Sequence, residues 1–154
     1  MQTNVLEYLE KSVLKFRDKE AYISEDHAYT FGQVYDESRR IGSFLKNEGL
    51  YKEPILVYMS RDPRAIVSYF GALYSGNYYV PIDAEMPASR IELIIEKLNP
   101  RMLICDEITE SLVEKINYTN RVVRFDHINT TSMDEDALLA VRQKAIDTDP
   151  LYVV

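Results

Sequence analysis

The amino-acid sequence predicts an α/β fold: a mostly parallel sheet flanked by helices on both faces, with a small N-terminal β-hairpin. Two observations carry this prediction. Short apolar runs alternate along the chain with segments in which apolar residues recur every three or four positions. The runs also lack polar alternation, which is typical of parallel strands that are covered on both sides. Strands that alternate with helices form right-handed crossovers, and these build a parallel sheet between two helical layers.

The sequence pattern of residues 4–30 predicts one helix followed by the hairpin. In segment 4–16, one helical face carries the apolar residues Leu6, Leu9, Val13 and Phe16. Residues 21–24 and 28–30 are short strand candidates on either side of a polar turn. This arrangement predicts an amphipathic helix followed by two antiparallel strands.

A capping box predicts where the second helix begins. Thr30 precedes Gln33 by three positions, so each side chain can satisfy a backbone N–H at the helix start. Gly49 is placed to end this helix in a left-handed conformation. We therefore expect a long helix over residues 31–48.

The central part of the chain predicts four strands, of which the first and third read as buried. These are residues 54–58, 78–82, 102–105 and 122–125. Pro81 is expected to stop the second of them, because proline donates no ladder hydrogen bond. Asp62 and Pro63 read as the N-cap and first position of a buried helix that ends at Gly76.

Further helices are expected between and after these strands. They cover residues 64–75, 90–98, 111–116 and 137–145. A polar segment over residues 127–135 separates the last strand of the sheet from the last helix. Residues 151–154 begin another apolar strand. Asp134, Glu135 and Asp136 lack the glycine and closing glutamate of a calcium loop, so they predict a helix N-terminus.

Composition excludes several classes of function. Eighteen Lys and Arg residues against 25 Asp and Glu residues give a net charge of −7, which disfavours nucleic acid or an anionic membrane as partner. Cys105 is the single cysteine, so one chain can form neither a disulfide nor a thiolate metal site. The sequence has no signal-peptide pattern and no run long enough to span a membrane. We expect a soluble protein of the reducing cytoplasm.

A search for reactive groups finds no catalytic, cofactor-binding or metal-ligating residue in this chain. Gly71 and Gly76 have the spacing of a phosphate loop, but no Lys-Ser or Lys-Thr pair follows. His27 and His127 are expected to be solvent-exposed loop histidines without a second ligand nearby. Cys105 ends an apolar run and is expected to be a buried structural thiol. The 12 tyrosines are interpreted as packing residues.

Three segments resemble the first two core motifs of the AMP-forming adenylating enzymes. They are Tyr-Thr-Phe-Gly-Gln-Val at 29–34, Gly-Asn-Tyr-Tyr-Val-Pro-Ile-Asp at 76–83, and Pro-Ala-Ser-Arg-Ile at 87–91. That superfamily includes nonribosomal peptide synthetase adenylation domains, D-alanine carrier-protein ligases, acyl-CoA synthetases and luciferases. The resemblance covers essentially the whole chain, although Tyr74 and Ser75 replace the usual Lys and Ala.

Two further features of the resemblance indicate a branch of this superfamily. Asp83 directly after Val-Pro-Ile is similar to the amino-acid-activating branch. The short connection over residues 50–54 lacks the Gly-Asp pair common in peptide synthetases, which favours the D-alanine ligases.

The resemblance implies that residues 1–154 are a single compact unit, the partial N-terminal subdomain of a larger adenylating-enzyme fold. In the family, the phosphate loop follows a strand like residues 151–154, so the chain is expected to stop just before it. The residues that hold ribose, adenine and amino acid, and the catalytic lysine, would lie further on. We therefore expect this chain alone to be inactive and to bind no cofactor tightly.

The implied parent enzyme uses ATP and Mg²⁺ to activate an amino acid, D-alanine, as an aminoacyl-AMP. It then transfers the aminoacyl group to a phosphopantetheine carrier protein. Two alternatives stay open: a fragment of an acyl-CoA synthetase, and a complete non-catalytic α/β binding module. A severed sheet would leave an exposed edge, so the fragment is expected to self-associate.

Overall fold

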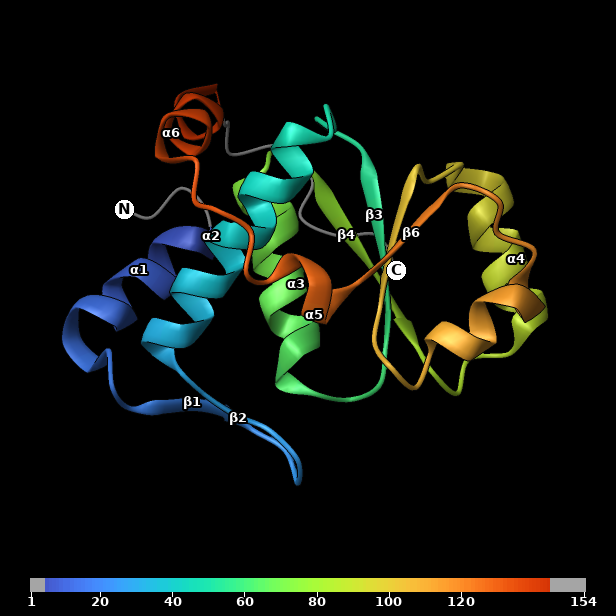
Figure 1. Cartoon of the computed structure of the whole chain (residues 1–154), viewed down its shortest axis with the longest axis horizontal. Coiled ribbons are helices and arrows are strands. Elements are labelled where there is room, and N and C mark those ends of the chain that lie inside the picture. The colour runs from blue at the N-terminus through green and yellow to red at the C-terminus, as the bar shows by residue number, and fades with distance from the viewer. Residues whose placement is uncertain (1–4, 145–154) are drawn as a thin grey trace.

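The computed structural model describes residues 5–144, and its centre is a four-stranded parallel sheet in the order β4-β3-β5-β6 (Figure 1). The strands are β3 (Pro54–Met59), β4 (Tyr78–Asp83), β5 (Met102–Cys105) and β6 (Arg121–Arg124). Every residue of β3 and β5, the two central strands, is buried. The apolar runs therefore form a parallel sheet covered on both faces, as the sequence predicts.

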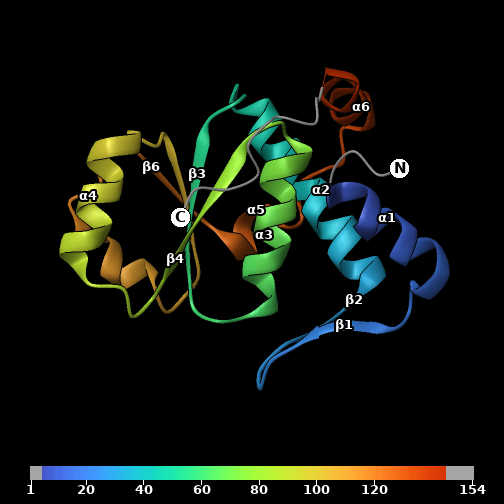
Figure 2. The same ribbon diagram turned by 180° about the vertical axis from the view of Figure 1, so that it is seen from behind.

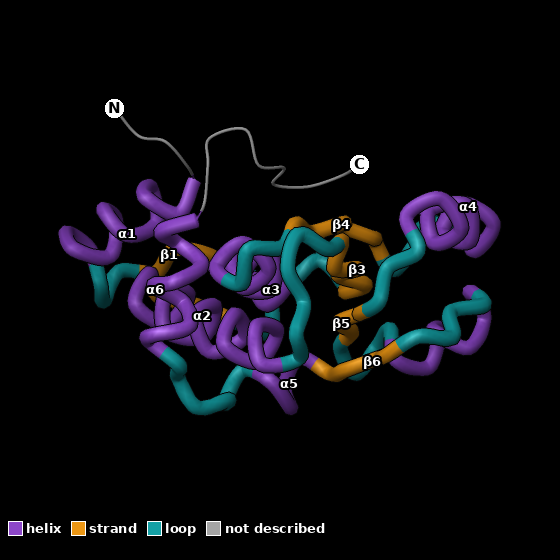
Figure 3. Tube along the Cα trace, turned by 90° about the horizontal axis from the view of Figure 1, so that it is seen from above, coloured by secondary structure: helices purple, strands orange, loops and turns teal. Residues whose placement is uncertain are grey.

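Helices cover both faces of this sheet (Figure 2 and Figure 3). One face carries α1 (Val5–Phe16), α2 (Phe31–Asn47), α3 (Pro63–Tyr74), α5 (Phe125–Ile128) and α6 (Glu135–Lys144). The other face carries α4 (Ala88–Leu98) and a 3-10 helix, η1 (Glu110–Ile116). The α/β class and the two helical layers are confirmed.

Alternate residues of the central strands supply two separate apolar cores. Ile55, Val57 and Ile104 point into the core beneath the larger helical layer. Leu56 and Leu103 point into the smaller core beneath α4 and η1. This alternation follows from the two-residue period of a strand, so each central strand contributes to both cores.

Helices α2 and α3 approach each other closely because Gly71 has no side chain. A Cβ added there would lie 2.6 Å from Cγ2 of Ile41, and this is closer than carbon atoms can approach. Glycine at this position therefore allows the close spacing of α2 and α3.

The predicted N-terminal hairpin consists of β1 (Glu20–Ile23) and β2 (Ala28–Thr30). Thr30 also caps α2: its hydroxyl accepts from the Gln33 amide at 3.1 Å, and Gln33 Oε1 accepts from the Thr30 amide at 2.8 Å. The capping box is therefore confirmed in both directions. Gly49 has a positive φ of 80°, in line with the predicted left-handed end of α2.

Several sequence-based predictions about boundaries are wrong. Pro81 lies inside β4 and does not stop it, because β4 is an edge strand of the described sheet and its outer side needs no donor. Phe125 starts helix α5 and does not end β6, and the predicted polar segment begins inside that helix. Phe125 and Ile128 stand three positions apart and are both buried, so they anchor one helical turn.

The remaining predictions for the described elements hold with small shifts. Segment 111–116 is helical, but in the tighter 3-10 form. Asp134 precedes α6 and accepts a hydrogen bond from the Ala137 amide at 3.1 Å, which confirms a helix N-terminus there. Residues 151–154, the last predicted strand, lie outside the described residues. Within residues 5–144, no helix is long and apolar enough to cross a membrane.

Candidate functional site

Polar and charged side chains from the loops after β3 and β5 lie together at the carboxyl edge of the parallel sheet. In open α/β sheets, ligands bind outside the carboxyl ends of the strands, where neighbouring connections leave in opposite directions. Here β3 leads through α3 to β4, whereas β5 leads through η1 to β6 on the other side. The crevice between the ends of β3 and β5 is therefore the candidate position for a ligand site.

This crevice is filled by the protein's own groups. Asp106 follows β5 and is 1% exposed; its Oδ2 accepts from the amide of Ser60 at 2.9 Å and from the hydroxyl at 2.7 Å. Its Oδ1 accepts from the amides of Ile108 at 2.9 Å and Thr109 at 2.8 Å. Burial raises the pKa of Asp106, but these hydrogen bonds outweigh it and hold that pKa below its usual value. Asp106 ties the two loops together and leaves no free acceptor for a ligand.

A chain of ion pairs crosses the same edge. Arg64 is buried, and its guanidinium contacts Asp62 through Nε at 3.0 Å and Glu107 through Nη1 at 2.9 Å. Burial lowers the pKa of Arg64, but the hydrogen bonds to Glu107 and Asp62 outweigh it and raise that pKa above its usual value. The pairs connect the start of α3 to the loop after β5.

His27 extends this chain to the hairpin, and the sequence-based prediction for it is wrong. It does not lie free in solvent, because its Nδ1 stands 2.6 Å from Oδ2 of Asp62 and its side chain is 35% exposed. His127 is also misplaced by the prediction, since it belongs to helix α5, although its side chain is 70% exposed. Asp62 caps α3 as predicted, accepting from the Arg64 amide at 2.9 Å.

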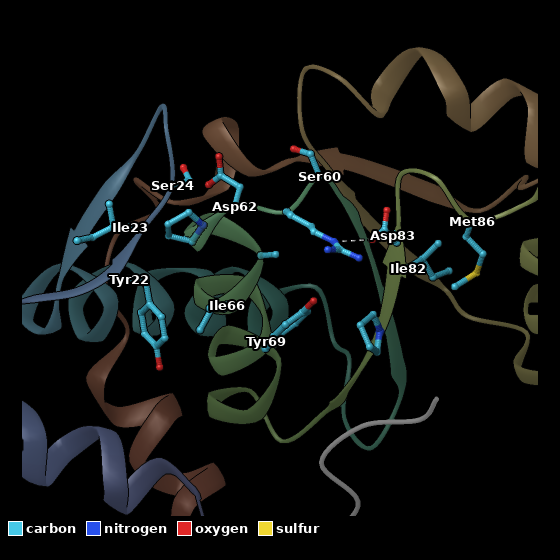
Figure 4. A pocket seen from close by; sticks show the side chains of 14 residues that line it. Tyr22, Ile23, Ser24, Ser60, Asp62, Ile66, Tyr69, Ile82, Asp83 and Met86 are labelled. Carbon is cyan, nitrogen blue, oxygen red and sulfur yellow. Dashed lines mark hydrogen bonds and ion pairs between the residues drawn. The ribbon is translucent and has the colours of Figure 1, made fainter.

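A pocket of about 550 Å³ opens beside these ion pairs (Figure 4). Its lining comes from β1 and the turn after it, from the loop after β3 with the first half of α3, and from the end of β4 with the loop after it. The apolar side chains in this lining include Tyr22, Ile66, Tyr69, Ile82 and Met86.

Polar contacts cross one end of this pocket. Arg61 is 90% exposed, and its Nε donates to Oδ2 of Asp83 at 3.1 Å. Asp83 also accepts the Glu85 amide, and this hydrogen bond is the largest cause of a pKa below the usual value for Asp83.

The N-terminus of α3 does not fit a phosphate group of ATP. The N-terminus of α3 is the helix start nearest the pocket, but the carboxylate of Asp62 already occupies its first free N–H and would repel an anion. Among residues 5–144, no group of three or more His, Cys, Asp and Glu side chains could hold a metal ion.

No nucleophile among the described candidates is activated. Cys105 is fully buried, as predicted, and burial raises the pKa of its thiol to about 12. The hydroxyl of Ser60 donates to Asp106, a carboxylate and not a histidine base. The sequence assigns no catalytic or cofactor-binding residue to this chain, and that remains a prediction.

Comparison with known proteins places this fold in a family. Residues 9–153 match the family described as AMP-binding enzyme. The D-alanine–D-alanyl carrier protein ligase of Bacillus velezensis is 39% identical over 137 residues, which cover 88% of this chain and 26% of that protein. The ligase of the same name from Listeria welshimeri is 34% identical over 78% of this chain and 23% of its own length.

Solved structures agree at the level of the fold. A four-domain nonribosomal peptide synthetase bound to AMP and glycine superposes with a TM-score of 0.76 at 20% identity, over 98% of this chain and 11% of that one. The chain spans about a quarter of the length of the curated relatives it matches. With the family match over nearly all of its residues, the chain belongs to the AMP-binding enzyme family.

Proposed function

We propose that this chain forms the N-terminal part of an ATP-dependent ligase that activates D-alanine and transfers it to a carrier protein. The observation that carries the proposal is the 39% identity, over 88% of the chain, to a ligase named for D-alanine and its carrier protein. Asp83, which resembles the amino-acid-activating branch, supports an amino acid as substrate.

The proposed reaction has two steps. The carboxylate of the amino acid attacks the α-phosphorus of ATP, a new P–O bond forms, and pyrophosphate leaves. The phosphopantetheine thiolate of the carrier protein then attacks the acyl carbon of the adenylate, and AMP leaves. Mg²⁺ and cationic side chains stabilise the phosphate charge in such chemistry. We assign those groups to parts of the protein outside these 154 residues, because the carboxyl edge described above is occupied by its own carboxylates.

We also propose that residues 1–154 fold as a single compact unit that works in the cytoplasm and stops before the phosphate loop. Self-association of the isolated chain stays a prediction, supported by exposed apolar side chains such as Leu14 (87% exposed) and Leu93 (66% exposed). Two results together would weaken the fragment interpretation: the purified chain sediments as a strict monomer, and it melts in a single cooperative transition at high temperature.

The experiment that tests the proposed function is ATP–pyrophosphate exchange by the protein encoded by the complete gene. D-alanine is expected to support exchange well above L-alanine, glycine and fatty acids. Exchange that depends on a fatty acid would identify an acyl-CoA synthetase and overturn the proposal. A gene that stops after codon 154 would instead support a non-catalytic module.

The 154-residue chain gives a second, separate test. We expect no exchange above background at any amino-acid concentration, because the resemblance implies that the phosphate loop follows residues 151–154. Measurable exchange by the purified chain would show that the chemistry lies within it.

A further inference from the structure

The β1–β2 hairpin forms one wall of the pocket, and it has few anchoring contacts of its own. Tyr29 is its one residue in the buried class, whereas Glu20, Ile23 and Ala28 are exposed. A two-stranded hairpin is only marginally stable without packing partners. Its position must therefore be set by specific contacts to the body of the molecule.

Polar contacts hold the hairpin near its base, where the Thr30 capping box also lies, and at its tip. Near its base, the Tyr29 hydroxyl donates to Oε1 of Glu37 on α2 at 3.1 Å. At its tip, the turn is closed by the Ser24 amide, which donates to the His27 carbonyl at 2.7 Å. The 2.6 Å contact between His27 Nδ1 and Asp62 Oδ2 joins this turn to the rest of the described molecule, residues 5–144.

The proton in that contact can be assigned to the histidine. Asp62 is nearly buried: burial raises the pKa of its carboxyl, but the hydrogen bonds from Arg64 and His27 outweigh it and hold that pKa below the usual value. An ionised carboxylate only accepts hydrogen bonds. His27 Nδ1 must therefore carry the hydrogen, also when the imidazole is neutral, while Nε2 is left for solvent.

We propose that the hairpin is a strap over the pocket, with the contact between His27 and Asp62 as its latch. When the latch is made, Tyr22 and Ile23 wall the pocket; when it breaks, the tip swings away while the sheet stays folded. Segments with few buried apolar contacts open in this way far below the free energy of global unfolding. The width of the pocket on the hairpin side then depends on one side-chain contact.

Other charges surround the latch and stay paired when it opens. Arg64 remains bonded to both Asp62 and Glu107. The acids of the turn, Glu25 and Asp26, are exposed. Loss of the His27 contact thus leaves no buried carboxylate without a partner, so opening does not have to unfold α3.

Hydrogen exchange of the backbone amides, followed by NMR on the 154-residue chain, tests the strap. His27→Ala is expected to speed exchange of the Ser24 amide about tenfold or more, with no change at the amides of β3 and β5. His27→Asn places an amide donor near the position of Nδ1 and is expected to restore slow exchange. The matched control is His127→Ala, the same substitution at a histidine whose nearest carboxylate oxygen is 4.0 Å away, and it should leave Ser24 unchanged.

Three results would overturn the strap. An unchanged Ser24 rate in His27→Ala would mean that the contact holds nothing, and an equal rise at β3 and β5 would mean that it serves global stability only. If the Ser24 amide exchanges as fast in His27→Asn as in His27→Ala, the hydrogen-bond donor at position 27 does not hold the hairpin. The unsubstituted chain gives a further check, because imidazole ¹⁵N shifts of neutral His27 must report a protonated Nδ1; a protonated Nε2 would contradict the latch.

Discussion

The four-stranded sheet and the N-terminal hairpin are both β structure, but they are stabilised in different ways. Both central strands of the sheet are buried along their whole length between two apolar cores. The hairpin has a single residue in the buried class, Tyr29, and is held by polar contacts near its base and at its tip. Apolar burial is non-directional and additive, whereas a hydrogen bond depends on one geometry. Substitutions should therefore have global effects in the sheet and local effects in the hairpin.

The carboxyl edge of the sheet is intermediate between the sheet and the hairpin, because it is buried but stabilised by polar contacts. It joins the apolar sheet to the hairpin through Arg64, a buried cation with carboxylates on both sides. Its charges are paired within the molecule, at the edge where an α/β protein commonly binds its ligand. The pocket is displaced toward the hairpin, whose strands contain a single residue in the buried class.

The largest expected effect tests the sheet. Ile104 is fully buried at the centre of β5, and Ile104→Ala is expected to lower the free energy of unfolding by about 3–4 kcal/mol, because it leaves a cavity. Urea denaturation followed by circular dichroism measures this loss. Leu139→Ala, at a position 57% exposed on α6, is the control and should change stability by less than about 0.5 kcal/mol. Equal losses at both positions would break the distinction between core and surface.

The next effect tests the carboxyl edge with a pair of neighbouring arginines. Arg64→Ala leaves the nearly buried Asp62 carboxylate without its main partner, so we expect the free energy of unfolding to fall by about 2–3 kcal/mol. The loss of the second partner, Glu107, adds little to this, because the Glu107 side chain is 47% exposed and water can solvate it. Arg61→Ala removes a pair whose arginine is 90% exposed and should cost no more than about 0.5 kcal/mol. Chemical denaturation at neutral pH compares the two. A loss for Arg61→Ala as large as for Arg64→Ala would show that burial does not decide the strength of these pairs.

Local signals in the sequence predict much of this fold. The capping box of Thr30 and Gln33, the N-cap Asp62 and the apolar strand runs all act within a few residues, so no tertiary information is needed to read them. Pro81 shows the limit of such rules: whether a proline ends a strand depends on whether that strand lies at an edge.

The contacts of the carboxyl edge could not be predicted in the same way. Ser60 and Asp106 are 46 positions apart, and Arg64 and Glu107 are 43 apart, so their pairing depends on the strand order. One signal was available. Polar residues follow both central apolar runs, and the carboxyl ends of parallel strands meet at one edge. No comparable signal pairs His27 with Asp62, because the hairpin does not belong to the sheet.

The smallest effect tests the base of the hairpin. Glu37 is half-buried and accepts from Tyr29 at 3.1 Å and from Asn129 at 2.8 Å; burial is the largest cause of its raised pKa. A carboxyl with a raised folded-state pKa stabilises the fold below its unfolded pKa of about 4.3, and that contribution is lost as the pH rises through the folded pKa. Glu37→Gln keeps an acceptor and removes the charge. It should therefore stabilise the protein at pH 7.

The expected gain is below about 1 kcal/mol, because water partly screens this carboxylate, and it should shrink to nothing near pH 4. Thermal or urea unfolding at both pH values measures it. Glu25→Gln, the same substitution at an exposed position of the hairpin turn, is the control and should be neutral at both. A loss of stability at pH 7 for Glu37→Gln would mean that the hairpin base needs the charge itself. The hairpin would then depend on ionised carboxylates at both ends, Glu37 at the base and Asp62 at the tip.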